Sequence, residues 1–150
     1  MSSLKDQYAS ELLRSIPVVK GMNISIESLG KDSLRISAPL DSNINYEGTA
    51  FGGSLNTTCI LSCYLLVHHV LKQNDIKFKS LVIQDSEIKY LIPVDGDFGA
   101  QAFFEAGSVQ FLIKQLHSKG RGRVSVNSQV SLKGESETRV NFKGRFVVTS

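Results

Sequence analysis

The sequence predicts an α+β protein in which a largely antiparallel β-sheet wraps around one long central helix. Two observations predict this fold class. Residues 50–71 contain no Asp, Glu, Lys or Arg, which is typical of a helix enclosed by its own protein. Short segments that alternate apolar and polar residues flank this stretch, as expected for strands with one buried face.

The segment before the charge-free stretch predicts one helix and one hairpin. An apolar residue recurs every four positions from Leu4 to Ile16, and Pro17 ends this short amphipathic helix. Two extended runs follow at residues 21–28 and 33–38. The four residues between them include a glycine, so we expect a tight turn there.

The central helix and the remaining strands follow in order. Ser54 is expected to cap the helix, which should run to about Lys72. Strands are predicted at residues 78–94, 99–105, 123–132 and 138–148. Residues 106–117 fit either a short helix or a strand.

Composition limits the classes of function. At 150 residues, with 41% hydrophobic and 21% charged residues, the chain is expected to form one domain over residues 1–150. A net charge of +3 does not indicate nucleic-acid binding. Polar residues within 50–71 argue against a membrane span. Two cysteines and an N-terminus unlike a signal peptide predict a cytoplasmic protein.

No metal site is predicted, because the chain lacks a convincing set of ligands. Cys59 and Cys63 lie one helical turn apart, but His68 and His69 fall off the same stripe of the helix. Both cysteines are interpreted as small packing residues.

The run NINYEGTAFGGSL, residues 43–55, places two glycines directly before the central helix. Glycine has no Cβ, so a bound carbonyl could approach the backbone amides of Gly52, Gly53 or Ser54. Amides at a helix N-terminus have no intrahelical partner and favour negative charge. Taken alone, the glycines favour tight packing of the loop on the helix; together with Asn45, Gly48 and the Tyr-Leu-x-Pro-Val strand at residues 90–94, they favour an oxyanion site.

Two motifs give the chain a family resemblance. Residues 45–53 resemble the loop N-x-x-G-x-x-H-G-G of hotdog-fold acyl-thioester enzymes, and residues 90–94 resemble their aromatic-Leu-x-Pro-Val strand. The run GTAFGGSL is more narrowly similar to the YiiD C-terminal, thioesterase-like family. The matching positions are Asn45, Gly48, Phe51, Gly52 and Gly53 in the loop, and Tyr90, Leu91, Pro93, Val94 and Gly96 in and after the strand.

The resemblance implies a hotdog fold and an enzyme acting on acyl thioesters of coenzyme A or acyl carrier protein. Asn45, Gly53 and Ser54 are the expected catalytic groups, with Phe51 and Gly52 binding substrate. No cofactor is implied except the coenzyme A or phosphopantetheine that carries the acyl group. Hotdog subunits generally join their sheets and form active sites at the interface, so a homodimer or a dimer of dimers is implied.

Departures from the family pattern keep two reactions open. Many hotdog thioesterases carry an Asp or Glu two turns into the central helix, whereas this helix has no carboxylate and Phe51 replaces the motif His. Thioester hydrolysis is one reading. Decarboxylation of malonyl carrier protein, implicated for some family members, is the other, because it requires enolate stabilisation and no carboxylate base. A non-catalytic acyl-thioester-binding module is a third hypothesis.

Further site residues are expected along the helix. Tyr64 is a candidate catalytic phenol on the same face as Thr57, and Thr57 and Ser62 are expected to contact substrate. Alternatively, Tyr64 is a core aromatic whose hydroxyl is satisfied by His68. Asp85 and Glu87 could supply the missing carboxylate from a strand; the alternative is that they lie on a solvated edge or pair with Lys89 on the same face.

The densest basic run lies at residues 114–123. Its Lys119, Arg121 and Arg123 are expected to bind the phosphates of coenzyme A or the acidic surface of acyl carrier protein. The alternative is an ordinary solvated turn.

Overall fold

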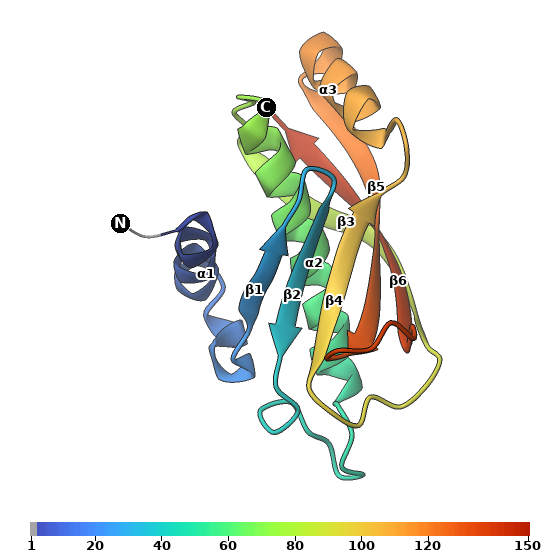
Figure 1. Ribbon diagram of the computed structural model, residues 1–150. Helices are drawn as coiled ribbons and strands as arrows, with labels where there is room; N and C mark the ends of the chain where they lie inside the picture. The colour runs from blue at the N-terminus through green and yellow to red at the C-terminus, as the bar shows by residue number, and fades with distance from the viewer. Residues whose placement is uncertain (1–2) are drawn as a thin grey trace.

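The computed structural model describes residues 3–150 (Figure 1). Its elements, in chain order, are α1 (Leu4–Ser15), the 3₁₀ helix η1 (Pro17–Met22), β1 (Ser25–Leu29), β2 (Ser33–Ala38), α2 (Gly52–Gln73), β3 (Ser80–Tyr90), β4 (Phe98–Phe104), α3 (Ser108–Lys119), β5 (Arg121–Leu132) and β6 (Val140–Thr149).

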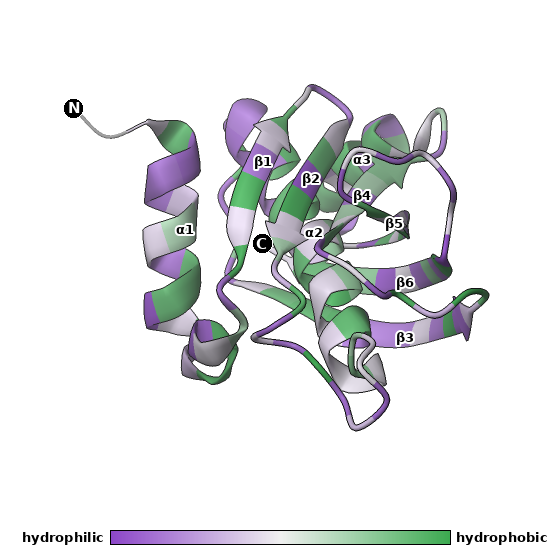
Figure 2. Ribbon diagram, turned by 60° about the horizontal axis from the view of Figure 1, so that its bottom comes forward, coloured by the Kyte–Doolittle hydropathy of each residue, from purple (hydrophilic) through white to green (hydrophobic). Residues whose placement is uncertain are grey.

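The strands form one six-stranded sheet in the order β1-β2-β4-β5-β6-β3, and every neighbouring pair is antiparallel. The sheet curves around α2, with β1 and β2 on one side of the helix and β6 and β3 on the other (Figure 2). Alternate residues therefore face α2, as Leu34, Ile36 and Ala38 of β2 do. The predicted α+β arrangement of a sheet around a central helix is confirmed.

Helix α2 is the centre of the hydrophobic core. Its Cys59, Cys63, Leu66, Val67 and Leu71 have no exposed surface. By length and composition it could cross a membrane, but two-thirds of its most apolar window, 67%, is buried by the rest of the chain. The lack of charge on this helix is therefore explained by enclosure within the fold.

Several boundaries differ from the sequence prediction. Residues 21–22 belong to η1, not to a strand, because Pro17 starts a 3₁₀ helix that ends at Asn23 in the left-handed region. Strand β3 ends at Tyr90, because the amides of Leu91 and Ile92 both donate to the Arg139 carbonyl. Strand β5 starts two residues earlier than expected, and β6 two residues later.

The ambiguous segment at residues 106–117 is helical. Gly107, at φ +84°, precedes α3, and Leu112 and Leu116 are buried beneath it. Helix α3 packs on β5 at the end of the sheet that also holds the C-terminus (Figure 1).

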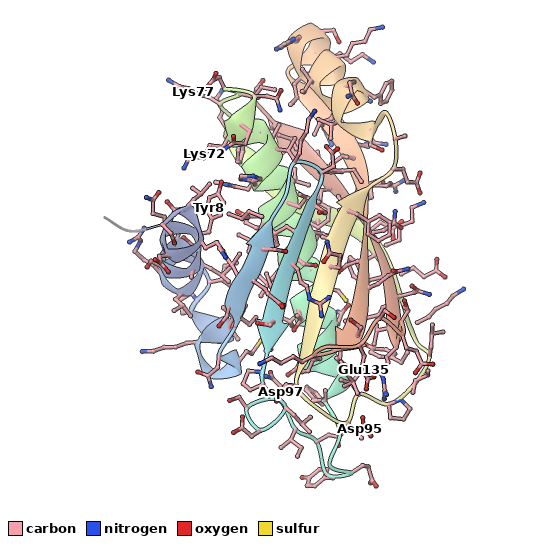
Figure 3. All side chains as sticks on the ribbon, in the orientation of Figure 1. Tyr8, Lys72, Lys77, Asp95, Asp97 and Glu135 are labelled. Carbon is pink, nitrogen blue, oxygen red and sulfur yellow. The ribbon has the colours of Figure 1, made fainter. Side chains whose placement is uncertain are left out.

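Helix α1 is docked onto α2 through a buried aromatic contact. Ser3 and Asp6 form a reciprocal capping box at its start. Tyr8 is 1% exposed, and its hydroxyl shares a 2.9 Å hydrogen bond with His69 Nδ1. The Lys72 ammonium lies 5.5 Å from the centre of the Tyr8 ring, and both side chains lie between the two helices (Figure 3). A polar core contact thus sets the position of the N-terminal helix.

The two edges of the sheet differ. At β1, the register shifts between Ile26 and Ser28, and the Glu27 carbonyl accepts a hydrogen bond from Lys5 Nζ of α1, 3.1 Å away. Helix α1 lies beside this edge (Figure 1). Among residues 3–150, the eleven-residue strand β3 pairs with β6 alone, so its other edge offers backbone groups to a further strand.

Stability is expected to depend on pH through the helix α1 contact. Burial lowers the pKa of both His68 and His69, which face Tyr8, Glu11 and Lys72. The unfolded chain then binds protons more readily than the folded one, so stability is full above pH 6.5 and falls as the pH drops below that value. Urea denaturation at about pH 7.5 and about pH 5 measures this difference.

Two variants test whether the contact between helices α1 and α2 causes the pH dependence of stability. Tyr8→Phe should cost about 1 kcal/mol of unfolding free energy at neutral pH, because one buried hydrogen bond is lost. His117 is exposed on α3, so His117→Gln is the matched control and should retain the full pH dependence. Equal wild-type stability at the two pH values would contradict the interpretation.

Candidate functional site

The two sequence motifs meet at the N-terminus of α2. The Ala50 amide donates to the Val94 carbonyl at 2.7 Å, and the Phe51 amide donates to the Asn43 carbonyl at 2.7 Å. The Tyr90 hydroxyl donates to the Gly52 carbonyl at 3.2 Å. The loop before α2 and the segment after β3 are therefore one structural unit.

Asn45 organises the loop. Its Oδ1 accepts from the amides of Glu47 at 2.8 Å and Thr49 at 3.0 Å, while its Nδ2 donates to Thr49 Oγ1 at 2.9 Å. Gly48, at φ +80°, supplies the left-handed residue that this turn needs. The Asn45 side chain keeps one N–H for a ligand but has a clear structural task in the chain.

The first turn of α2 has no side-chain cap. The N-cap residue is Phe51, which makes no capping bond, so the prediction that Ser54 caps the helix is wrong. Ser54 lies inside the helix because the chain becomes helical at Gly52, two residues earlier. Within residues 3–150, the amides of Gly52, Gly53 and Ser54 are left without an acceptor. This end of the helix dipole favours negative charge.

Two aromatic rings flank the glycine pair. Phe51 is 57% exposed, and a Cβ on Gly53 would overlap its ring. A Cβ on Gly52 would lie 3.7 Å from the ring of Tyr90, an ordinary contact. Gly53 is thus required for the observed position of Phe51 over the start of the helix, whereas Gly52 is not required by its surroundings.

Tyr90 and Asn56 are site residues that sequence reasoning missed. Burial raises the pKa of the Tyr90 phenol, with nearby Cys59 adding to the effect. The aromatic position of the strand motif was the signal for Tyr90. Asn56 lies one turn beyond Gly52, and its buried Oδ1 has no hydrogen-bond partner among the described residues. No sequence signal marks that oxygen.

The residues predicted further along α2 do not join this site. Ser62 is fully buried, and its hydroxyl bonds the Cys59 carbonyl at 2.8 Å and Ser128 Oγ at 2.7 Å. The prediction that Ser62 contacts substrate is corrected by this placement, because the side chain faces the sheet.

Tyr64 lies about 18 Å along the helix from Gly52, at 1.5 Å per residue. Its ring stacks on His68 at 6.4 Å between ring centres, without the expected hydroxyl bond. It borders a small cavity next to α1. Thr57 is half-buried one turn beyond Gly53, so only Thr57 of the three remains near the helix start.

The strand carboxylates point away from the helix start. Asp85 pairs with Arg145 at 3.4 Å and Glu87 pairs with Lys89 at 3.6 Å, on the face of the sheet opposite α2. Neither can therefore act at the amides of α2 within one chain. Among the described residues, no three His, Cys, Asp or Glu side chains gather as metal ligands.

The predicted basic residues lie at the other end of the sheet. Lys119, Arg121 and Arg123 border a shallow hollow of about 480 Å³ between α3 and β5. Tyr90 of β3 and Val130 of β5 both pair with Val140 of β6, so they lie at the same level of the sheet. The distance along β5 from Val130 back to Arg121 is about 30 Å, at about 3.3 Å per residue. One chain does not bring these basic residues to the glycine pair.

Comparison with known proteins places these features in a family. A family model described as a putative thioesterase, the YiiD C-terminal family, matches residues 5–150. No curated protein matches the chain at a significant level.

Solved structures resemble the whole chain. A protein of unknown function from Chlorobaculum tepidum is 26% identical with a TM-score of 0.85, covering 97% of this chain and 96% of its own. A putative thioesterase from Shewanella oneidensis is 24% identical with a TM-score of 0.84 and full coverage of both chains. A thioesterase from Haemophilus influenzae is 17% identical with a TM-score of 0.73, covering 99% and 92%. The fold is the hotdog fold that the resemblance implied.

The two glycines are expected to respond differently to substitution. Gly53→Ala should displace the Phe51 ring and lower kcat/KM for an acyl thioester roughly tenfold, because the wall of the site moves. Gly52→Ala is the matched control, with an effect on kcat/KM of about twofold or less. Both variants should remain folded, since alanine is about 1 kcal/mol better than glycine within a helix. Equal kcat/KM for the two variants would rule out this role of Phe51.

Proposed function

The chain belongs to the YiiD C-terminal family of putative thioesterases, and on that premise we propose that it hydrolyses acyl thioesters of coenzyme A or acyl carrier protein. The observation that carries the proposal is the uncapped start of α2, where three free amides lie between the rings of Phe51 and Tyr90.

These amides suit the oxyanion of thioester hydrolysis. Water adds to the carbonyl carbon, negative charge develops on the carbonyl oxygen, and the C–S bond then breaks to release the acid and the thiol. The amides of Gly52, Gly53 and Ser54 can donate to that oxygen, and losing one such donor commonly costs about 3 kcal/mol of barrier stabilisation. The single uncommitted N–H of Asn45 is a further donor.

Asn56 supports a pantetheine-bearing substrate. Its side-chain oxygen is a buried acceptor without a partner, one turn from Gly52. The pantetheine arm that coenzyme A and carrier proteins share contains amide N–H groups. One of these groups could donate to Asn56 Oδ1 while the thioester carbonyl meets the helix amides.

Decarboxylation of a malonyl thioester is the second candidate. The observation that favours it is the absence of a carboxylate from α2, together with the outward direction of Asp85 and Glu87. The bond between the carboxylate and the α-carbon would break, carbon dioxide would leave, and its electron pair would form an enolate on the thioester. Protonation of the α-carbon then gives the acetyl thioester. The same amides would stabilise the enolate oxygen.

Intact-mass analysis distinguishes these reactions. Malonyl-, acetyl- and longer acyl-loaded carrier proteins, and the matching coenzyme A esters, are incubated with the protein. Release of free thiol establishes hydrolysis, whereas conversion of malonyl to acetyl establishes decarboxylation. Unchanged masses for every ester would reject both reactions and leave a binding module.

We also propose that the site is completed in a homodimer joined through β3. This strand has an open edge, and the side chains of Ile83 and Tyr90 on its α2-facing side are exposed by 37% and 53%. The exposed apolar residues Ile44, Phe51 and Leu91 lie next to this side in the loop unit. A second copy that adds its own β3 would cover them.

Antiparallel pairing of the two β3 strands also accounts for the basic residues. A twofold axis perpendicular to the sheet reverses the second copy, so its α3–β5 end comes beside the α2 N-terminus of the first. Lys119, Arg121 and Arg123 of one copy would then serve the acyl site of the other, by binding a phosphate or an acidic carrier surface. This arrangement supports a substrate whose acyl group is attached to coenzyme A or to acyl carrier protein.

The dimer is tested by placing a charge at the proposed interface. Ile83→Lys should convert a species of twice the chain mass into a monomer, because a buried unpaired ammonium is costly. Val18→Lys is the matched control, since Val18 is 84% exposed on η1, away from β3. Light scattering after size-exclusion chromatography measures the mass. A wild-type monomer at micromolar concentration would overturn the proposal.

A further inference from the structure

A pocket on the outer face of the sheet, opposite α2, lies outside the proposed acyl site. Its volume is about 240 Å³, and it crosses β1, β2 and β4 near the loop that follows β2. Figure 3 labels Asp97, at the margin of this pocket, at the lower end of β4. The side chains that border it include two acids and two bases: Glu27, Arg35, Asp97 and Lys133.

The floor of the pocket, which includes Ser25 and Ser37, belongs to a row of small residues that continues across the sheet. Ser25 pairs with Ser37, Ser37 with Gly99, and Gly99 with Ser131, so four adjacent strands contribute a hydroxyl or no side chain at one level. A Cβ on Gly99 would lie 2.7 Å from Arg35 Nη2 and 2.8 Å from the Ile36 carbonyl oxygen. The glycine is therefore what allows the Arg35 guanidinium to lie flat against the sheet.

Two hydrogen bonds hold the Arg35 guanidinium in place and leave further N–H groups that can bind a ligand. Arg35 Nε donates to Glu27 Oε2 at 2.9 Å, and Nη2 donates to Ser131 Oγ at 3.3 Å. The Arg35 side chain is 19% exposed. A guanidinium has five N–H groups, and these bonds use two of them. The Nη1 edge has no protein partner among the described residues, and its planar geometry suits a carboxylate.

The opposite margin supplies a free acid and a free base. One Asp97 oxygen accepts from the Leu40 amide at 2.9 Å, and the other has no partner within the described part of the chain. Within the same residues, the Lys133 ammonium makes no ion pair. Asp97 lies two residues before Gly99, against which the Arg35 guanidinium lies, so both charged groups border the same pocket. The pocket therefore has a carboxylate-binding group from β2 and an ammonium-binding group from the residue before β4.

We propose that this pocket binds a free α-amino acid, with its carboxylate on Arg35 and its ammonium on Asp97. The formal charges of the four bordering side chains cancel, so a simple anion would meet Glu27 and Asp97, whereas a zwitterion complements both signs. The hollow over Ser25 and Ser37, which both border the pocket, accommodates the amino acid's side chain. This binding is independent of the acyl site, which lies on the other face of the sheet.

Titration of the ¹⁵N-labelled full chain tests the proposal. Each of the twenty standard amino acids is added separately, followed by acetate and ethylamine, which each carry only one of the two charges. At least one amino acid should give saturable shifts of the Ser37, Gly99 and Ser131 amides, at least tenfold tighter than acetate or ethylamine. Equal binding of acetate would overturn the zwitterion assignment. No saturable shift at these amides with any amino acid would overturn the site.

Substitutions at the margin and the floor locate the bound molecule. Asp97→Asn keeps an oxygen for the Leu40 amide but loses the charge, so affinity should fall about tenfold or more. Ser37→Leu should abolish binding by filling the hollow. Asp75→Asn, between α2 and β3, is the matched control and should leave affinity unchanged. Unchanged affinity in both Asp97→Asn and Ser37→Leu would reject the pocket even if an amino acid bound elsewhere.

Discussion

Enclosure of α2 is the constraint on which the rest of this structure depends. A helix without charge over most of its length must be covered on every side, and one six-stranded sheet covers only part of its circumference. Helix α1 covers another part through Tyr8. The side next to β3 is covered by neither element, so within the described residues it keeps exposed apolar side chains such as that of Ile83.

The fold could be predicted because its signals are local and periodic. The charge-free helix, the hairpin and the four later strands all follow from spacing of apolar residues, and β2 matches its predicted range at both ends. The misplaced boundaries depend on hydrogen bonds between distant segments. Strand β3 stops at Tyr90 because the Arg139 carbonyl, just before β6, accepts hydrogen bonds from the amides of the next two residues, Leu91 and Ile92. These residues are too far apart in the sequence for a local pattern to predict their pairing.

The candidate site was predictable in part. The glycine pair and its backbone amides were identified from chemistry that glycine and helix ends share wherever they occur. Helical spacing shows which residues share a face but not what that face contacts: Ser62 contacts Ser128 of β5, and Tyr64 stacks on His68, the neighbour named in its alternative interpretation as a core aromatic. The structural role of Asn45 also could not be predicted from the sequence, because it rests on side-chain hydrogen bonds to Glu47 and Thr49 within its own turn.

The unequal edges of the sheet decide what kind of assembly this chain can make. If β1 and β3 were both open, each copy could accept a strand on either side, and a continuous ribbon of sheets could grow without limit. The displaced Glu27 and its bond to Lys5 disrupt the regular ladder at β1. Strand addition is therefore expected at the β3 edge and not at β1, and in the proposed dimer the pairing of two β3 strands would leave no regular edge on which a fibre could grow.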